Sequence, residues 1–151
     1  MKNSTHMLSA GLKRINRWVT TCAEHTLEVG RQIALTLSPN LPLCFLGDLG
    51  AGKTTLIKGI TTQITGIDPH EVNSPTFTYL NIYEGKQTLY HFDLYRLSGA
   101  EDFLSRGFDE YLEGLCCIEW SEKIETILPP KRALITMRYL GEQKREICHE
   151  V

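Results

Sequence analysis

Residues Gly47-Asp48-Leu49-Gly50-Ala51-Gly52-Lys53-Thr54 form the pattern G-x-x-x-x-G-K-[ST], which decides the fold of this chain of 151 residues. The apolar residues 43–46 before the pattern predict a short buried strand, and residues 53–64 after it predict a helix. A strand that passes through a glycine-rich loop into a helix is the context in which this pattern binds phosphate. The alternative is a glycine-rich turn before an ordinary helix. Because glycine is only about 7% of typical sequences, the complete pattern is unusual by chance.

Each fixed position of this loop has a mechanical role on a nucleoside triphosphate. Glycines at 47, 50 and 52 tolerate positive φ and let the backbone approach an anion. Successive backbone N–H groups and the positive end of the helix dipole would then face the phosphates. We expect Lys53 to contact the β and γ phosphates and the Thr54 hydroxyl to bind Mg²⁺. The predicted nucleotide-binding residues are Gly47, Asp48, Leu49, Gly50, Ala51, Gly52, Lys53, Thr54 and Thr55.

The patterns after the loop predict an α/β fold. Residues 77–83 and 88–92 are rich in aromatic and β-branched residues and flank a glycine-containing turn, which predicts a β-hairpin. The apolar run 115–118 predicts a strand buried on both faces, and residues 134–139 and 146–151 predict a closing antiparallel pair. We therefore expect a three-layer domain like that of P-loop NTPases. Its mixed sheet should be parallel in the centre and antiparallel at the flanks.

One domain is expected over residues 21–151, because the chain is long enough for one substantial core and short for two. Thr21 and Glu24 match a capping box for a first helix that runs to about Leu37. Residues 1–20 precede this helix, and we expect them to form a loosely ordered N-terminal extension.

The composition argues against a general attraction to nucleic acid or membranes. The net charge is −2, and the only basic concentration is Lys13, Arg14 and Arg17, which reads as a solvated flank or, alternatively, as a nucleic-acid contact. No apolar run approaches the roughly 20 residues that span a bilayer, and the first residues lack the apolar core of a signal peptide. The five cysteines show no C-x-x-C pair and no zinc-like spacing. These features predict a cytoplasmic protein.

Two carboxylates follow predicted strands, Glu119 after residues 115–118 and Asp93 after residues 89–92. A phosphate loop needs an acidic partner for Mg²⁺, and ligands bind at the carboxyl ends of strands in open α/β sheets. The alternative is that each carboxylate caps the next turn or helix. The predicted catalytic residues are Asp93, Glu119 and Lys53, and the predicted Mg²⁺ ligands are Thr54, Glu119 and Thr76.

Other polar residues near these acids allow two interpretations each. Thr76 follows Ser-Pro and is either a third oxygen ligand, or γ-phosphate sensor, or a turn-initiating hydroxyl. Arg96 either neutralises phosphate charge or forms a salt bridge with Glu101 or Asp102. We expect His91 to be structural, because strand alternation turns it away from the face of its neighbour, the phenylalanine that follows.

Several blocks taken together resemble one family. In this order and spacing the chain resembles the bacterial TsaE family, the ATPase component of tRNA threonylcarbamoyladenosine biosynthesis, from about Thr21 to about Tyr139. The phosphate loop is generic, whereas His-Phe-Asp-Leu-Tyr-Arg together with Ile-Glu-Trp is highly specific. The blocks are residues 47–55, Ser74-Pro-Thr-Phe77, His91-Phe-Asp-Leu-Tyr-Arg96, Ile118-Glu-Trp120 and Leu128-Pro129.

The resemblance implies a cytoplasmic, Mg²⁺-dependent ATPase with weak activity alone. The family acts with TsaB and TsaD, which attach the threonylcarbamoyl group to adenosine 37 of ANN-decoding tRNAs, and ATP hydrolysis is thought to reset that complex. Carried over by position, Lys53 binds phosphate, Thr54 and Glu119 hold Mg²⁺, and Asp93 belongs to the hydrolytic site. Trp120 matches the tryptophan of the Ile-Glu-Trp block. The N-terminal extension departs from the usual short start of the family.

Two functions of other classes use the same loop. A small-molecule kinase would need an acceptor pocket and commonly an arginine-rich lid, whereas Arg96 and Arg106 are isolated in this sequence. A nucleotide switch that docks a partner without hydrolysis is the other. The sequence has no Asn-Lys-x-Asp segment of the kind that reads guanine in GTPases, so motifs leave the base undetermined.

Overall fold

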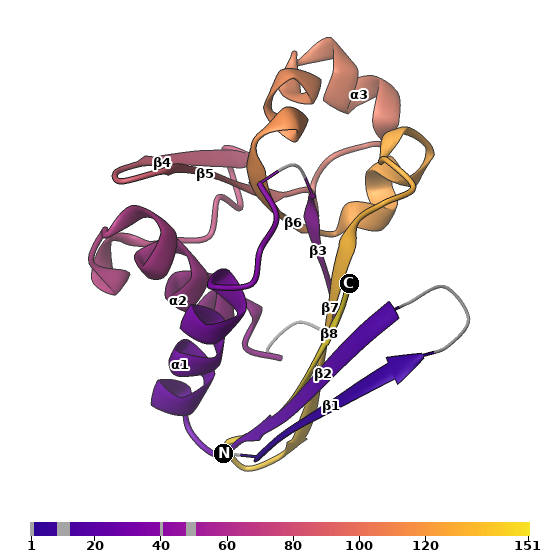
Figure 1. The fold of residues 1–151 in the computed structure, drawn as a ribbon. Coiled ribbons are helices and arrows are strands. Elements are labelled where there is room, and N and C mark those ends of the chain that lie inside the picture. The colour runs from indigo at the N-terminus through magenta and orange to yellow at the C-terminus, as the bar shows by residue number, and fades with distance from the viewer. Residues whose placement is uncertain (1, 9–12, 40, 48–50) are drawn as a thin grey trace.

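The computed structural model describes residues 2–8, 13–39, 41–47 and 51–151 (Figure 1). The strands are β1 (Lys2–Leu8), β2 (Lys13–Thr20), β3 (Leu43–Leu46), β4 (Leu80–Glu84), β5 (Thr88–Asp93), β6 (Leu115–Glu119), β7 (Ala133–Gly141) and β8 (Lys144–Glu150). The α-helices are α1 (Ala23–Ala34), α2 (Lys53–Thr65) and α3 (Ala100–Ser105), and the 3₁₀-helices are η1 (Pro69–Glu71), η2 (Phe108–Glu113) and η3 (Ser121–Ile127).

The strands form one eight-stranded sheet in the order β1-β2-β8-β7-β3-β6-β5-β4. In its centre β3 is parallel to β6 and β7, and β5 is parallel to β6. The pairs β1–β2, β2–β8, β7–β8 and β4–β5 are antiparallel. This confirms the predicted mixed sheet with a parallel centre and antiparallel flanks.

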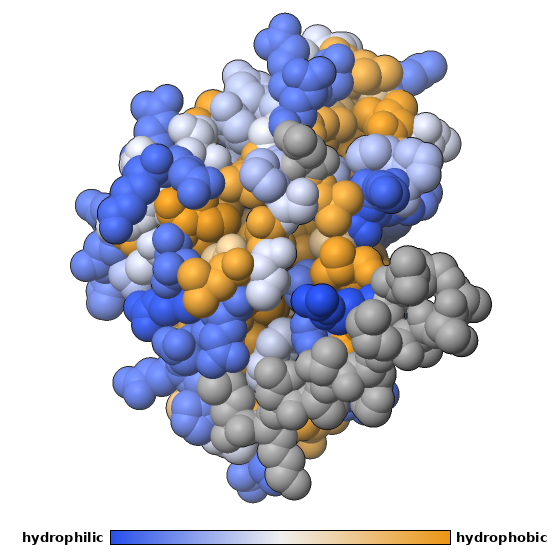
Figure 2. Space-filling view, viewed as in Figure 1, coloured by the Kyte–Doolittle hydropathy of each residue, from blue (hydrophilic) through white to orange (hydrophobic). Residues whose placement is uncertain are grey.

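Helices cover the two faces of the sheet, which gives three layers (Figure 1). On one face α1 and α2 pack over a core that includes Phe45, Ile135 and Ile147. On the other face α3, η2 and η3 pack over a second core around Phe92 and Ile118, whereas η1 lies against α2. In Figure 2 hydrophobic residues gather in the middle of the visible face, and hydrophilic residues form much of its outline.

The N-terminal segment differs from the predicted loose extension, because residues 13–20 are a strand inside the sheet. This strand, β2, pairs with β1 on one side and with β8 on the other. Trp18 lies in the α1–α2 core with only 4% of its surface exposed. The strand has no strict apolar alternation in the sequence, since exposed Arg17 lies on the same face as Ile15 and Val19. Trp18 lies on the opposite face, so periodicity did not reveal the strand.

The predicted capping box of the first helix is wrong. The N-cap of α1 is Cys22, which makes no side-chain capping bond, and the helix ends at Ala34. The Thr21 hydroxyl instead lies 2.9 Å from His25 Nδ1. All five cysteines are free thiols. Among the described residues no helix has the length and apolar character needed to cross a membrane.

Candidate nucleotide-binding site

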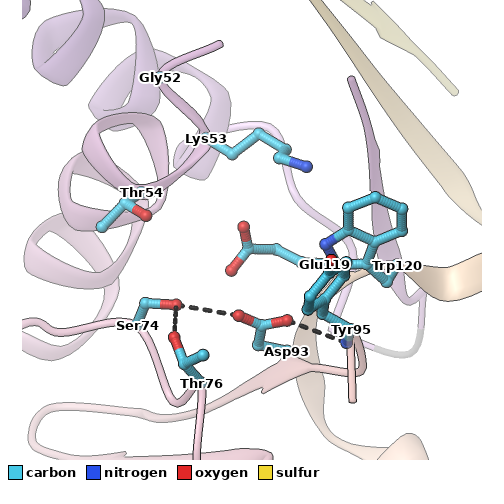
Figure 3. A pocket seen from close by; sticks show the side chains of 9 residues that line it. All are labelled: Gly52, Lys53, Thr54, Ser74, Thr76, Asp93, Tyr95, Glu119 and Trp120. Carbon is cyan, nitrogen blue, oxygen red and sulfur yellow. Dashed lines mark hydrogen bonds between the residues drawn. The ribbon is translucent and has the colours of Figure 1, made fainter. Parts of the chain in front are cut away.

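A pocket of about 430 Å³ opens where the first turn of α2 faces the carboxyl ends of β5 and β6 (Figure 3). It collects five of the residues that the sequence predicted for catalysis and metal binding. It also contains Ser74 and Tyr95, neither of which had a predicted role of its own. The lining residues are Gly52, Lys53, Thr54, Ser74, Thr76, Asp93, Tyr95, Glu119 and Trp120.

The loop geometry places Lys53 over this pocket. Gly52, the N-cap of α2, has φ 95° in the left-handed region that favours glycine. Gly47 has φ 145°, and a Cβ there would lie 2.7 Å from the backbone oxygen of Met137. The buried Lys53 ammonium donates to the Gly47 oxygen at 2.8 Å and lies 5.0 Å from the centroid of the Trp120 ring. A buried ammonium group needs such partners, since losing water is costly for a charge.

Glu119 is a buried carboxylate at the end of β6 with one specific partner. His91 Nε2 lies 2.8 Å from Glu119 Oε2, and both side chains are buried. In the parallel register of β5 and β6, Asp93 lies opposite Glu119, so both acids reach the same edge of the sheet. In Figure 3 the Glu119 carboxylate points into the space between Thr54 and Lys53.

Asp93 has different partners, which connect it to a loop. Ser74 Oγ donates to Asp93 Oδ2 at 3.1 Å, and the backbone N–H of Tyr95 donates to Oδ1 at 3.1 Å. Thr76 Oγ1 donates in turn to Ser74 Oγ at 3.4 Å. Two hydroxyl groups of the segment between α2 and β4 thus form a chain that ends on the Asp93 carboxylate (Figure 3).

Trp120 lies at the rim of the pocket in an uncommon backbone conformation. Its φ of 60° is in the left-handed region, where residues other than glycine are rare. The Trp120 ring packs on Tyr95, with the ring centroids 5.0 Å apart. Such outliers persist where the surrounding structure holds them, and they cluster at functional sites. The structure therefore places Trp120 in the wall of the pocket.

The oxygen atoms of the pocket suit Mg²⁺. This ion prefers hard oxygen ligands and is usually held by one or two protein groups together with phosphates and waters. Thr54 offers a hydroxyl and Glu119 a carboxylate, whose Oε1 is not engaged by His91. The described residues contain no cluster of three His, Cys, Asp or Glu side chains that could hold a metal without a nucleotide. The set therefore fits a cation that enters with phosphates. Thr76 also lines the pocket.

A second, smaller hollow of about 300 Å³ adjoins the first through Gly52. Among its lining residues are Thr55, Cys22 and Thr26 of the α1 end, and Gln143 and Arg145 of the β7–β8 hairpin. Arg145 was not expected in the site. The register of β7 and β8 places Arg145 opposite Tyr139. The Arg145 guanidinium carbon lies over the Tyr139 ring, 4.4 Å from its centroid.

Some predicted residues lie outside the first pocket. Asp48, Leu49 and Gly50 lie outside the described residues, and Ala51 is buried beside the loop. Arg96 is exposed and does not line the pocket.

The Arg96 guanidinium stacks on Phe77 at 4.5 Å. Of the two acids predicted as alternative partners of Arg96, Glu101 and Asp102, the second forms an ion pair with Arg106 at 2.8 Å. His91 does face away from Phe92, as expected, but that face carries Glu119.

Comparison with known proteins identifies the family. The family model described as Threonylcarbamoyl adenosine biosynthesis protein TsaE matches residues 20–147. The chain belongs to the TsaE family. It is 40% identical over 133 residues to the tRNA threonylcarbamoyladenosine biosynthesis protein TsaE of Treponema pallidum (strain Nichols), covering 87% of this chain and 97% of that protein. The protein of the same name from Bacillus subtilis (strain 168) is 40% identical over 134 residues, covering 87% of this chain and 82% of the relative.

A solved structure supports the same fold. The crystal structure of Bacillus subtilis YdiB matches with a TM-score of 0.72 and 32% sequence identity, covering 99% of this chain and 88% of that chain. The region matched by the TsaE model includes every residue that lines the first pocket. The sequence resemblance and the predicted fold class are thereby confirmed, and this TsaE protein is placed in tRNA threonylcarbamoyladenosine biosynthesis.

Proposed function

We propose that this TsaE protein is a Mg²⁺-dependent ATPase that acts with TsaB and TsaD in forming threonylcarbamoyladenosine at position 37 of ANN-decoding tRNAs. ATP hydrolysis resets that complex between turnovers. The observation that carries the proposal is the convergence of Lys53, Thr54, Asp93 and Glu119 on one pocket at the start of α2. A phosphate-binding helix end, a lysine and two carboxylates are the parts that phosphoryl-transfer sites use.

Phosphate binding would change the partners of Lys53. Its ammonium donates to the Gly47 oxygen, and a phosphate oxygen offers a charged acceptor in place of a neutral one. The N-terminus of α2 adds unpaired backbone N–H groups and the positive end of the helix dipole. Thr54 and Glu119 would hold Mg²⁺, which neutralises phosphate charge when bound. These residues supply binding and orientation, which are most of what phosphoryl transfer requires from a protein.

The Asp93 carboxylate is the group placed to act on water. Its oxygens accept hydrogen bonds, so Asp93 can accept one from a water molecule and orient it toward the terminal phosphate. Such a role agrees with the position of Asp93 opposite Glu119 at the ends of two parallel strands. In this division of roles Asp93 acts on water, whereas Lys53 binds phosphate and Thr54 binds the metal.

The adjoining hollow would receive the nucleoside part of ATP. It shares Gly52 with the phosphate pocket, and Thr55 follows the two residues assigned to the phosphates and metal. Gln143 offers an amide that can both donate and accept hydrogen bonds, and the Arg145 guanidinium offers a flat cationic surface. A purine ring can stack on such a surface.

The Ser74–Thr76 segment would report which nucleotide is bound. Its hydroxyl groups line the pocket and are linked to Asp93, so a γ phosphate that contacts them can change the position of the segment. A ligand shifts a conformational equilibrium only through unequal affinity for the two states. We therefore expect the ATP-bound and ADP-bound forms to differ in affinity for TsaB–TsaD.

Phosphate release by the parent protein and by Lys53→Ala, each alone and with TsaB–TsaD, tests the proposal. The parent should hydrolyse ATP slowly alone and faster in the complex, and Lys53→Ala should lose about 100-fold or more in rate. Lys58→Ala is the matched control, because Lys58 lies on the same helix outside the lining of the pocket. Equal partner affinity with ATP and ADP, together with tRNA modification without hydrolysis, would contradict the resetting role. Efficient phosphate transfer to a metabolite would favour a kinase.

A further inference from the structure

The buried histidine of β5 makes one side-chain hydrogen bond among the described residues, and its partner is the carboxylate assigned to Mg²⁺. His91 is 0% exposed, and its Nε2 lies 2.8 Å from Glu119 Oε2. Its other ring nitrogen, Nδ1, is also buried and has no hydrogen-bond partner in the described structure. A carboxylate that binds a metal ion can only accept a hydrogen bond from His91, so in that role of Glu119 the hydrogen would be on Nε2.

The sheet register explains how His91 reaches Glu119. Opposite His91 in β6 is Cys117, and opposite Asp93 is Glu119, so His91 meets Glu119 along a diagonal of the same face. Both residues lie on paired central strands of the sheet, so the backbone that carries the two side chains is fixed by hydrogen bonds. The His91 ring can therefore hold one oxygen of Glu119 and leave the other facing the pocket.

A second buried histidine shows that burial alone does not require such a partner here. His149 on β8 is 1% exposed, and neither of its ring nitrogens has a hydrogen-bond partner in the described structure. It lies outside both hollows assigned to the nucleotide. The fold thus tolerates a buried imidazole without a carboxylate partner. Burial of His91 therefore does not by itself account for its hydrogen bond with Glu119.

We propose that His91 is a positioning residue that fixes the Glu119 carboxylate for Mg²⁺. The inference rests on the proposed Mg²⁺–nucleotide site. It assigns to His91 the role of an outer partner, which orients a metal-binding carboxylate without touching the metal. Such outer hydrogen bonds typically contribute 10- to 100-fold to metal affinity. His91 should accordingly affect metal binding far more than it affects binding of the metal-free nucleotide.

The test is Mn²⁺ binding, followed by electron paramagnetic resonance with a non-hydrolysable ATP analogue. His91→Leu removes the donor, and we expect a 10- to 100-fold weaker Mn²⁺ affinity with nucleotide affinity in EDTA changed less than about twofold. His91→Gln keeps an N–H near the place of Nε2 and should recover most of the loss. His149→Leu is the matched control for removing a buried imidazole and should leave Mn²⁺ affinity unchanged.

The outcomes separate this inference from the proposed function. Parent-like Mn²⁺ affinity in a folded His91→Leu variant would overturn the role of His91 alone. Absence of Mn²⁺–nucleotide binding in the parent would overturn the proposed function and this inference with it. Nitrogen-15 NMR of the parent provides a second test if His91→Leu does not fold. A ring hydrogen on Nε2 is expected, whereas a ring with a hydrogen on Nδ1 and none on Nε2 would overturn the proposal.

Discussion

The two acids of the pocket are restrained by partners of different kinds. Glu119 is held by His91, a side chain of the neighbouring strand, whereas Asp93 is held by Ser74 in a loop and by the backbone N–H of Tyr95. The carboxylate assigned to the metal is therefore fixed within the sheet. The Asp93 carboxylate, which is assigned to water, is hydrogen-bonded to a segment that faces the γ phosphate in the proposed function. Movement of that segment would therefore change the hydrolytic step.

At the scale of single residues, Asp93→Asn should slow phosphate release strongly while ATP affinity and melting temperature stay near those of the parent. The amide replaces one acceptor oxygen by a donor and removes the charge that orients water. Ser74→Ala removes one hydrogen bond to Asp93, a change of about 1 kcal/mol, so its rate should fall about fivefold. Single-turnover phosphate release measures both effects.

Ser98 provides a matched control for Ser74. Its hydroxyl also donates to an aspartate, Asp102, at 3.2 Å, but on the exposed surface away from the pocket. Ser98→Ala should release phosphate at the rate of the parent. Unchanged release by Asp93→Asn would show that the carboxylate has no part in hydrolysis.

At the scale of elements, the position of α2 depends on a close crossing with α1. A Cβ at Gly59 would lie 2.0 Å from the backbone oxygen of Leu27, and one at Gly30 would lie 2.3 Å from the backbone oxygen of Leu56. Neither contact can be relieved by a side-chain rotation, because the obstructing atoms belong to the backbone. Two glycines on facing helices thus set how near α2, which carries Lys53 and Thr54, lies to α1.

Gly59→Ala should therefore destabilise the fold although alanine favours helices. The gain in helix propensity is about 1 kcal/mol, whereas forcing extra volume into a packed contact costs about 1–3 kcal/mol and here meets backbone atoms. We expect a net loss of about 1–2 kcal/mol in the free energy of unfolding, measured by urea denaturation.

Gln63→Ala on the exposed face of α2 is the control and should change stability by less than about 0.5 kcal/mol. A Gly59→Ala variant as stable as the parent would show that the two helices can separate without cost. The ATP affinity of Gly59→Ala also tests whether the position of α2 matters for nucleotide binding.

Elements with a local signal were predictable, and those defined by distant partners were not. The strand before the loop, the helix from Lys53, the hairpin and β6 each carry their own pattern of apolar residues and glycines. In the site, the acids at strand ends were predictable because strand ends share one edge. His91 and Arg145 were not assigned to it, because their contacts depend on strand register and on a hairpin far along the chain. β2 was not predicted because its apolar residues do not alternate in the sequence and its partner β8 lies near the other end of the chain.

At the scale of the whole molecule, the antiparallel flank of the sheet carries a buried group that responds to pH. β2 and β8 extend the sheet beyond the parallel centre, and in their register Asn16 lies opposite the buried His149. Burial lowers the pKa of His149 from 6.5 to about 4. His149 is buried and neither of its ring nitrogens has a hydrogen-bond partner in the described structure, so protonation would place a charge on a buried ring without such a partner.

The sign of the resulting pH dependence follows from proton uptake. Between pH 6.5 and about 4 the unfolded chain binds a proton at His149 that the folded protein does not, so stability falls as the pH falls. The contribution of His149 is fully present above pH 6.5, and its loss should approach about 3 kcal/mol near pH 4.

His149→Leu removes the group that binds this proton, so the free energy of unfolding of the variant should fall less as the pH falls. Urea denaturation of parent and variant from pH 7 to pH 4 measures the difference, in which the titrations of the carboxylates common to both proteins cancel. Parallel stability curves would mean that the flank opens enough to hydrate the imidazole, and a steeper fall in the parent would mean that the sheet stays closed around it.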